Sequence, residues 1–330
     1  MRIVVFISFF LCAFFSKAQD PQFTQFYAAP MYLNPAFSGV NSGHRIIANY
    51  RKQWLNIPGA FNTYNFSYDR NLSDINSGIG VMVTHDKSGA GGLSWTQIKG
   101  QYAYQINLTR RLYLRSAMEF GYNWRYLDKT RLVFGDQLVR GPGFNTLEHL
   151  QDGRSNYADF GSGLLMYTKR WWAGVAVHHL NIPNESILGD LSPVPMKYSI
   201  HAGYKIPIHD FFGKHLDNHF IPAFNYKAQG KFDQFDVGFY YERSPLVFGV
   251  WYRGIPGFKA YEQGYQNNDA LIFLMGYKTE KLKLGYSYDI TISRLVTNTL
   301  GSHEISIIYE FGKSERSILE SVRDVPCPKF

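Results

Sequence analysis

The amino-acid sequence predicts an all-β protein, a transmembrane antiparallel β-barrel of about 14 strands with an irregular N-terminal arm and a short periplasmic C-terminal tail. Apolar and polar residues alternate with period two over segments as long as 111–126, whereas strands of soluble proteins average about five or six residues. Aromatic residues make up 17% of the chain, which is typical of barrels with aromatic girdles. No run of about 18 apolar residues occurs, which argues against a helical inner-membrane protein. A soluble, exported all-β protein is the alternative.

Residues 1–18 are expected to be a secretory signal peptide. A positive start precedes an apolar core at 3–15, and small residues flank Lys17 to give a cleavage site before Gln19. The apolar core is too short to span a bilayer, and Cys12 lacks the small preceding residue that a lipoprotein signal requires. We therefore expect an exported, unlipidated chain. Its one remaining cysteine, Cys327, cannot form an internal disulfide.

Residues 19–43 are expected to form an arm before the barrel. Pro21, Pro30 and Pro35 remove backbone donors, so this segment cannot be one helix or a central strand. Its many apolar side chains need a surface to pack against. That surface is the barrel lumen or the periplasmic mouth, and a purely structural arm is the simpler alternative. The residues expected to plug the barrel or to contact a partner are Asp20, Pro21, Gln22, Phe23, Phe26, Tyr27, Leu33, Asn34, Pro35 and Phe37.

Fourteen alternating segments follow and place a barrel at 44–311. They are 45–54, 62–69, 78–86, 94–108, 111–126, 157–167, 171–180, 196–208, 219–229, 232–243, 246–254, 269–279, 281–290 and 303–311. An even number of strands begins and ends on the same side, and short periplasmic connections should alternate with long extracellular ones. Two connections break this rule, the long one at 209–218 and the tight Gly230-Lys231 turn.

The segment 111–126 shows the two expected faces most clearly. Leu114, Met118 and Phe120 share one face, while Arg115 and Glu119 lie on the other. Such a strand suits lipid on one side and a wet lumen on the other. Charged lumen side chains line a pore or fill it as a structural network, and the sequence leaves both readings open. The positions concerned are Arg115, Glu119, Arg125, Lys205 and Arg243.

The segment 303–311 is predicted to be the final strand. It ends in an aromatic residue, the feature by which barrel-assembly machinery identifies outer-membrane proteins. The side chains that carry this prediction are Ile305, Ile307, Tyr309 and Phe311. Residues 312–330 then form a short tail, which we expect to lie in the periplasm beside the N-terminal arm.

The sequence contains no convincing catalytic or metal-binding pattern. Gly312-Lys313-Ser314 lacks the upstream glycine of a phosphate loop. The side chains of His178 and His179 point to opposite faces of a strand, which makes a shared metal ion improbable. The net charge of +8 is spread along the chain and gives nucleic-acid binding little support. We expect no enzymatic activity, no cofactor and no metal.

The opening motifs resemble a known family. The segment Asp20-Pro21-Gln22-Phe23, followed by Leu33-Asn34-Pro35-Ala36, is similar to the N-terminal signature of the PorP/SprF family. These are outer-membrane proteins of the type IX secretion system of Gram-negative gliding bacteria. The resemblance covers the whole chain, from signal peptide to aromatic final strand and tail.

Membership would imply a non-enzymatic, multi-pass outer-membrane barrel with both termini in the periplasm. Its partners would be a secreted adhesin with a C-terminal secretion domain, other type IX secretion components and outer-membrane lipid. The long connection at 127–156 is a candidate for partner contact, or a lid over the barrel. A lumen of about 14 strands is narrow for a folded adhesin, so we expect an anchor and not the protein-conducting pore. The alternative is a barrel similar to fatty-acid channels that transports a hydrophobic small molecule.

Overall fold

The computed structural model describes residues 20–141, 146–147, 153–208, 218–260, 266–293, 299–312 and 325–328. The predicted signal peptide lies outside these residues. The strands are β1 (His44–Gln53), β2 (Phe61–Leu72), β3 (Ser77–Ser88), β4 (Leu93–Asn107), β5 (Tyr113–Tyr126), β6 (Arg154–Tyr167), β7 (Trp171–His178), β8 (Lys197–Tyr204), β9 (Ile206–Pro207), β10 (Asn218–Gln229), β11 (Phe232–Arg243), β12 (Leu246–Ala260), β13 (Gln266–Lys278), β14 (Leu282–Thr291) and β15 (Ser302–Phe311). The short helices are η2 (Phe26–Ala28), α2 (Pro30–Leu33), η3 (Pro35–Phe37), η4 (Ser73–Ile75), η5 (Lys129–Arg131) and α3 (Gly135–Arg140).

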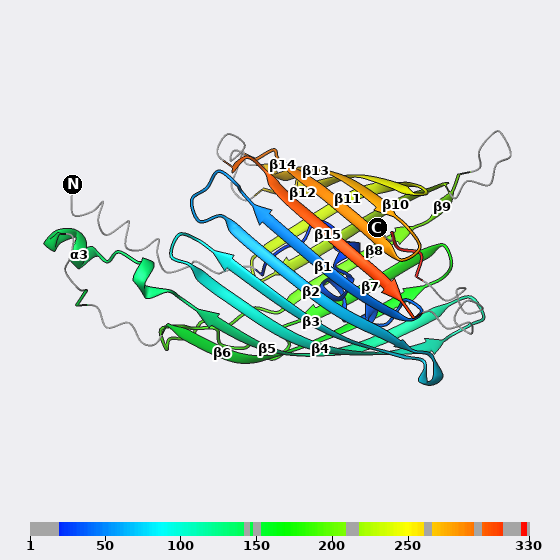
Figure 1. Cartoon of the computed structure of the whole chain (residues 1–330), viewed down its shortest axis with the longest axis horizontal. Coiled ribbons are helices and arrows are strands. Elements are labelled where there is room, and N and C mark those ends of the chain that lie inside the picture. Colours follow the sequence, from blue (N-terminus) through cyan, green and yellow to red (C-terminus); the bar gives the residue numbers. More distant parts are fainter. Residues whose placement is uncertain are drawn as a thin grey trace.

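The strands form one closed antiparallel barrel (Figure 1). Strands β8 and β9 pair in succession with β10 and together make one strand of the wall, which corresponds to the predicted segment 196–208. The barrel closes where β1 pairs with β15, from His44 opposite Phe311 to Gln53 opposite Ser302. The prediction of fourteen strands is therefore confirmed. Closure leaves no free sheet edge along this seam, as lipid requires.

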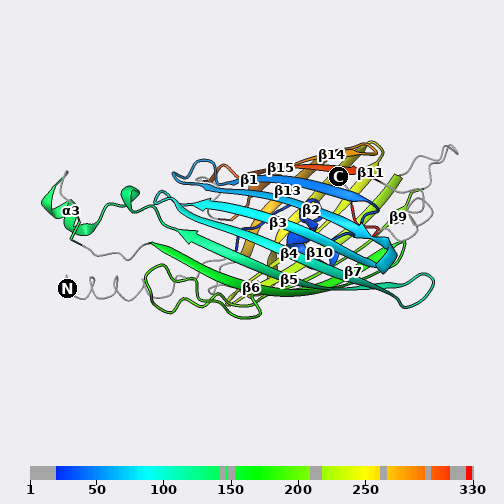
Figure 2. The same ribbon diagram turned by 60° about the horizontal axis from the view of Figure 1, so that its bottom comes forward.

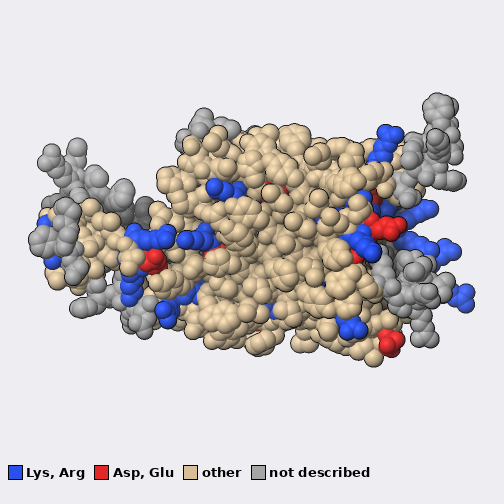
Figure 3. Space-filling model, in the orientation of Figure 1, with Lys and Arg blue, Asp and Glu red and all other residues tan. Residues whose placement is uncertain are grey.

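Side chains alternate between the lipid-facing surface and the lumen as the sequence predicts. In β5, Met118 is 73% exposed, whereas Arg115 and Glu119 are buried inside. A broad belt around the middle of the barrel carries almost no charged side chains on the face shown in Figure 3. The outward positions of β15, including Ile305 and Tyr309, are likewise exposed.

One predicted lumen residue lies elsewhere. Arg243 is exposed and has the same strand parity as the outward-facing Val237 and Phe239, so it belongs to the outer surface at the end of β11. The alternation continues to the last residue of β11, where Glu242 is buried and Arg243 is exposed, and a charged side chain can face outward there because it reaches the interface. Lys205 does face the lumen, where its ammonium lies 3.4 Å from the Glu242 carboxylate.

The two ends of the barrel differ in their connections (Figures 1 and 2). The short-turn end carries the connections 73–76, 108–112, 168–170, 244–245 and 279–281, together with the start of β1 and the end of β15. The long-loop end carries 54–60, 89–92, 127–153, 179–196 and 292–301, and the tight turn at 230–231. Most of the predicted long connection at 209–218 lies outside the described residues. Among the described residues no helix is long and apolar enough to cross a membrane.

The part of the C-terminal tail that the structure describes lies inside the barrel. Val325 is buried and belongs to the same core cluster as Tyr27 and Tyr240, and Cys327 packs against that cluster. This differs from the expected tail in the periplasm. The sequence gives no periodic pattern at 325–328 from which such insertion could be predicted.

Candidate functional site in the barrel lumen

The N-terminal arm, residues 20–43, runs through the lumen of the barrel (Figures 1 and 2). Its residues 23–41 are all buried except the half-buried Tyr32. Asp20 contacts residues at the long-loop end, and Gly39 contacts β2 near the short-turn end. We expected both termini at the short-turn end. The even strand count fixes only where β1 starts, and the arm before it turns back through the barrel.

Proline and asparagine set the local shape of the arm. Pro30 starts α2 and Pro35 starts η3, positions where the missing N–H costs nothing. Between them Asn34 caps η3, because its side-chain oxygen accepts a hydrogen bond of 2.9 Å from the Ala36 amide. The L-N-P-A motif therefore joins two short helical turns, α2 and η3, through the Asn34 cap.

The same asparagine attaches the arm to the barrel wall. Its side-chain amide donates to the carbonyls of Leu164 in β6 (3.1 Å) and Val175 in β7 (3.2 Å). This close approach requires glycine in the wall. A Cβ at Gly163 would lie 2.1 Å from the Asn34 side-chain oxygen, and one at Gly174 would lie 2.9 Å from its nitrogen.

This contact predicts the effect of a single added methyl group. Gly163→Ala should displace Asn34 and destabilise the folded barrel by about 1–3 kcal/mol, the usual cost of overpacking. Gly100→Ala is the matched control, because Gly100 lies in β4 with no neighbouring atom within 4 Å of an added Cβ. Its cost should stay within about 0.5 kcal/mol. Urea unfolding followed by tryptophan fluorescence measures both, and equal costs would contradict this account.

A buried charge network holds the first turn of the arm. The Glu304 carboxylate accepts hydrogen bonds from the backbone amides of Thr24 (2.7 Å) and Gln25 (3.0 Å). Arg51 lies 3.2 Å from Glu304 and 2.7 Å from Asp289. The Thr24 hydroxyl donates to Asp289 at 2.7 Å. These carboxylates and Arg51 are almost fully buried, so each charge depends on the others and on the arm for compensation.

The last residues of the arm are fixed at the short-turn end. The Gly39 amide donates to Asp69 at 2.7 Å, and Asp69 also pairs with Arg45 at 2.8 Å. Arg115 donates to the carbonyls of Ala36 (3.0 Å) and Ser38 (2.5 Å). Arg115, predicted to face the lumen, therefore belongs to a structural network that binds the arm.

Aromatic side chains fill the space between these polar contacts. Phe26 packs edge-on against Trp251, with ring centroids 5.3 Å apart, and Tyr27 packs against Trp172 in the same way. Phe37 stacks on His201 at 5.4 Å. The arm thus contributes apolar side chains to the main core cluster of the barrel.

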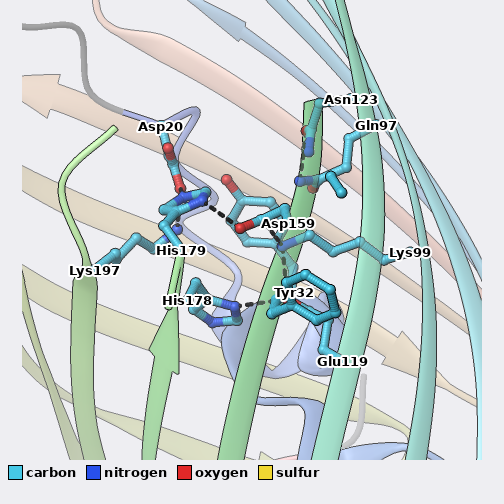
Figure 4. Close-up of polar contacts among 12 residues, drawn as sticks. Asp20, Tyr32, Gln97, Lys99, Glu119, Asn123, Asp159, His178, His179 and Lys197 are labelled. Carbon is cyan, nitrogen blue, oxygen red and sulfur yellow. Dashed lines mark hydrogen bonds and ion pairs between the residues drawn. The ribbon is translucent and has the colours of Figure 1, made fainter. Parts of the chain in front are cut away.

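The N-terminal end of the arm meets a second charge cluster (Figure 4). The Asp20 carboxylate lies 2.8 Å from Lys197 and 3.0 Å from His179, and His179 contacts Asp159 at 3.0 Å on its other side. Burial by itself raises the pKa of Asp20, but the charges of Lys197 and His179 outweigh it and hold that pKa well below its usual range. Burial lowers the pKa of His179, whereas Asp20 and Asp159 raise it to about 9.

These shifts predict how arm docking depends on pH. A raised histidine pKa stabilises the docked arm fully below about pH 6.5, and this contribution is lost as the pH rises through about 9. The lowered pKa of the Asp20 carboxyl stabilises the docked arm above about pH 4, and this contribution is lost only in stronger acid. Docking should therefore be tightest between about pH 4 and 6.5 and should weaken near pH 9.

The measurement is the labelling rate of a cysteine placed at Gln22 in a Cys327→Ser background. The rate, corrected for the intrinsic reactivity of a thiol, should rise as the pH passes 9. In the His179→Asn variant the corrected labelling rate should already be higher at pH 6 and should not rise as the pH passes 9. The prediction would be contradicted if, with and without the His179 substitution, the labelling rate changed with pH only as the ionisation of a free thiol does.

Of the ten predicted arm residues, Asp20, Pro21 and Gln22 are half-buried and the other seven are buried in the lumen; their role in plugging or partner contact stays a prediction. Arg51, Asp289 and Glu304, which fix the arm, were not predicted. Strand parity could have placed Glu304 in the lumen, because its neighbours Ile305 and Ile307 face outward. Among the described residues no cluster of His, Cys, Asp or Glu suits a metal ion.

A family of sequences described as "Type IX secretion system membrane protein PorP/SprF" matches residues 15–309. The chain belongs to the PorP/SprF family. A comparison with curated protein sequences found no significant match.

Solved outer-membrane transporters share the fold of this PorP/SprF protein. It is similar to the toluene transporter TbuX of Ralstonia pickettii, with 12% identity, a TM-score of 0.50, and coverage of 86% of this chain and 94% of TbuX. It is also similar to the toluene transporter TodX of P. putida, with 10% identity, a TM-score of 0.52, and coverage of 85% and 93%. At these identities the likeness concerns the barrel architecture alone. The PorP/SprF protein is therefore an outer-membrane β-barrel of the type IX secretion system.

Proposed function

We propose that this PorP/SprF protein docks a secreted surface adhesin through the adhesin's C-terminal secretion domain, and supports its export or display. The observation that supports an anchor best is the occupied lumen. The arm lies along the barrel axis, almost wholly buried, and is held by ion pairs at Asp20 and by Glu304. A barrel filled in this way suits a platform and not a conduit for a polypeptide.

The long-loop end offers a surface for such a partner. In outer-membrane barrels the long connections face outward from the cell, and here they expose apolar side chains beyond the barrel wall. Leu191 is 91% exposed, and Leu138 and Val139 in the projecting α3 are also largely exposed (Figure 1). Exposed apolar groups on the connections of one end favour protein contact. The exposed side chains of α3 favour partner contact over a lid as the role of the long connection, the two alternatives that the sequence leaves for 127–156.

Copurification from native membranes without detergent tests the proposal. A tagged wild-type barrel should recover a large secreted protein that carries a C-terminal secretion domain, identified by mass spectrometry. The variant L138D/V139D/L191D should lose most of it. Ile75→Asp, at the exposed Ile75 of the short-turn end, is the control and should retain it. Equal recovery of the secreted protein by both variants would show that the long-loop surface does not bind it.

The alternative function is transport of a hydrophobic small molecule. It has support from the fold, which the barrel shares with two toluene transporters. The same purification separates the two functions. Recovery of bound lipid or hydrocarbon with no secreted protein would favour transport and would overturn the docking role.

A further inference from the structure

Among the described residues, the exposed charges at the short-turn end are predominantly basic. Figure 3 shows Lys and Arg side chains gathered at this end of the barrel, beyond the uncharged belt. The exposed basic residues are Arg70, Arg110, Arg111, Lys169, Arg170, Arg243 and Lys281, which we call the basic rim. In the described part of the same end, only Asp74 and Glu280 are exposed acidic residues.

The rim residues form no ion pair with any described acidic group. Other cations of the barrel do so readily. Lys278, at the same end, pairs with Glu242, and at the long-loop end Arg131 pairs with Asp128 and Arg140 with Asp136. The positive charge of the rim is thus not neutralised by described residues of the chain.

The rim follows the circumference of the barrel. Its members lie at the end of β2, in the β4–β5 and β6–β7 turns, at the end of β11 and in the β13–β14 turn. A protein partner would cover one sector of this circle. An annulus of lipid headgroups surrounds the whole barrel and meets every member at once.

The depth of the rim also suits headgroups. Arg70 and Arg243 continue outward-facing rows of their strands, beyond Phe66 and Phe239, which face lipid. Arg110 lies in the β4–β5 turn, two residues after the exposed Leu108. Long basic side chains at the border of an apolar belt extend their charge to the interface, where phosphates accept hydrogen bonds from them.

We propose that the basic rim binds the phosphates of anionic phospholipids in the leaflet around the short-turn end, and so selects these lipids over zwitterionic ones. This role is independent of the docking function at the opposite end. Attraction of this kind depends on several cations acting together and is screened by salt. The lipid composition of that leaflet would then influence how firmly the barrel is held in it.

The test counts lipids retained by the purified full-length protein in native mass spectrometry. The protein is offered phosphatidylglycerol and phosphatidylethanolamine with identical acyl chains in equal amounts. Wild type should retain several-fold more phosphatidylglycerol, and added salt should reduce this preference. The variant R110Q/R111Q/K169Q/R170Q should bind both lipids about equally. The matched control K87Q/R131Q/R154Q/K231Q removes the same number of exposed cations from the long-loop end and should keep the preference.

The proposal is overturned if the rim variant keeps the preference, or if the control loses as much of it. It is also overturned if wild type shows no lipid preference but binds an acidic polypeptide such as polyglutamate in a rim-dependent manner, which would indicate a protein partner. Each variant is checked for folding by measuring whether the barrel resists unfolding in cold detergent.

Discussion

Deleting residues 20–36 should convert a closed barrel into an ion-conducting one. The wild-type lumen contains the arm along its length, and the segment removed provides the contacts at Asp20, Thr24 and Asn34. Without it, the charged side chains of Arg51 and Glu304 would face water. We therefore expect stepwise single-channel currents in planar bilayers for the deletion variant and none of comparable size for wild type.

The barrel itself should still insert into the membrane, because the strand pairing and the lipid-facing belt do not involve the arm. Removing α3, residues 135–140, is the control: this element lies outside the barrel, so the deletion should leave the currents at the wild-type level (Figure 1). If the arm deletion assembles and gives no new current, the arm does not plug the barrel. If it also displays the cargo normally, the arm is a stability element only.

The strands of this protein could be predicted because their signal is local. Alternation in a segment such as 111–126 reflects lipid on one side and the lumen on the other, and it needs no knowledge of the partner strand. Arg243, wrongly predicted to face the lumen, obeys the same alternation: it has the parity of the outward-facing Val237 and Phe239, and at the end of β11 its long side chain can extend the charge to the interface.

The site in the lumen could be predicted only in part. The prolines and apolar side chains of the arm indicate that it must pack against something, but the sequence does not say where. The decisive contacts join residues far apart in the chain, such as Thr24 with Glu304 and Asn34 with Val175. Long-range contacts of this kind leave no periodic pattern, and the insertion of Val325 is a second example.

Glu304→Ala should destabilise the protein more than any other single substitution considered for this barrel. The change leaves the amides of Thr24 and Gln25 without an acceptor and removes one of the two carboxylates beside Arg51. Loss of one partner from a buried ion pair costs about 3–5 kcal/mol, because the remaining charge is left uncompensated. Asp289, which lies 2.7 Å from Arg51, keeps the loss toward the lower part of that range.

Two further variants separate charge from hydrogen bonding. Glu304→Gln keeps an oxygen acceptor for one of the arm amides but loses the charge, so its cost should fall between those of Glu304→Ala and the control. Glu280→Ala, an exposed acid in a short turn, is the control and should cost within about 0.5 kcal/mol. Urea unfolding in lipid vesicles gives the three free energies. Because the arm is held by Glu304, the alanine variant should also expose residues 20–25 to protease before the barrel unfolds, whereas a purely local effect on β15 would leave the arm protected until global unfolding.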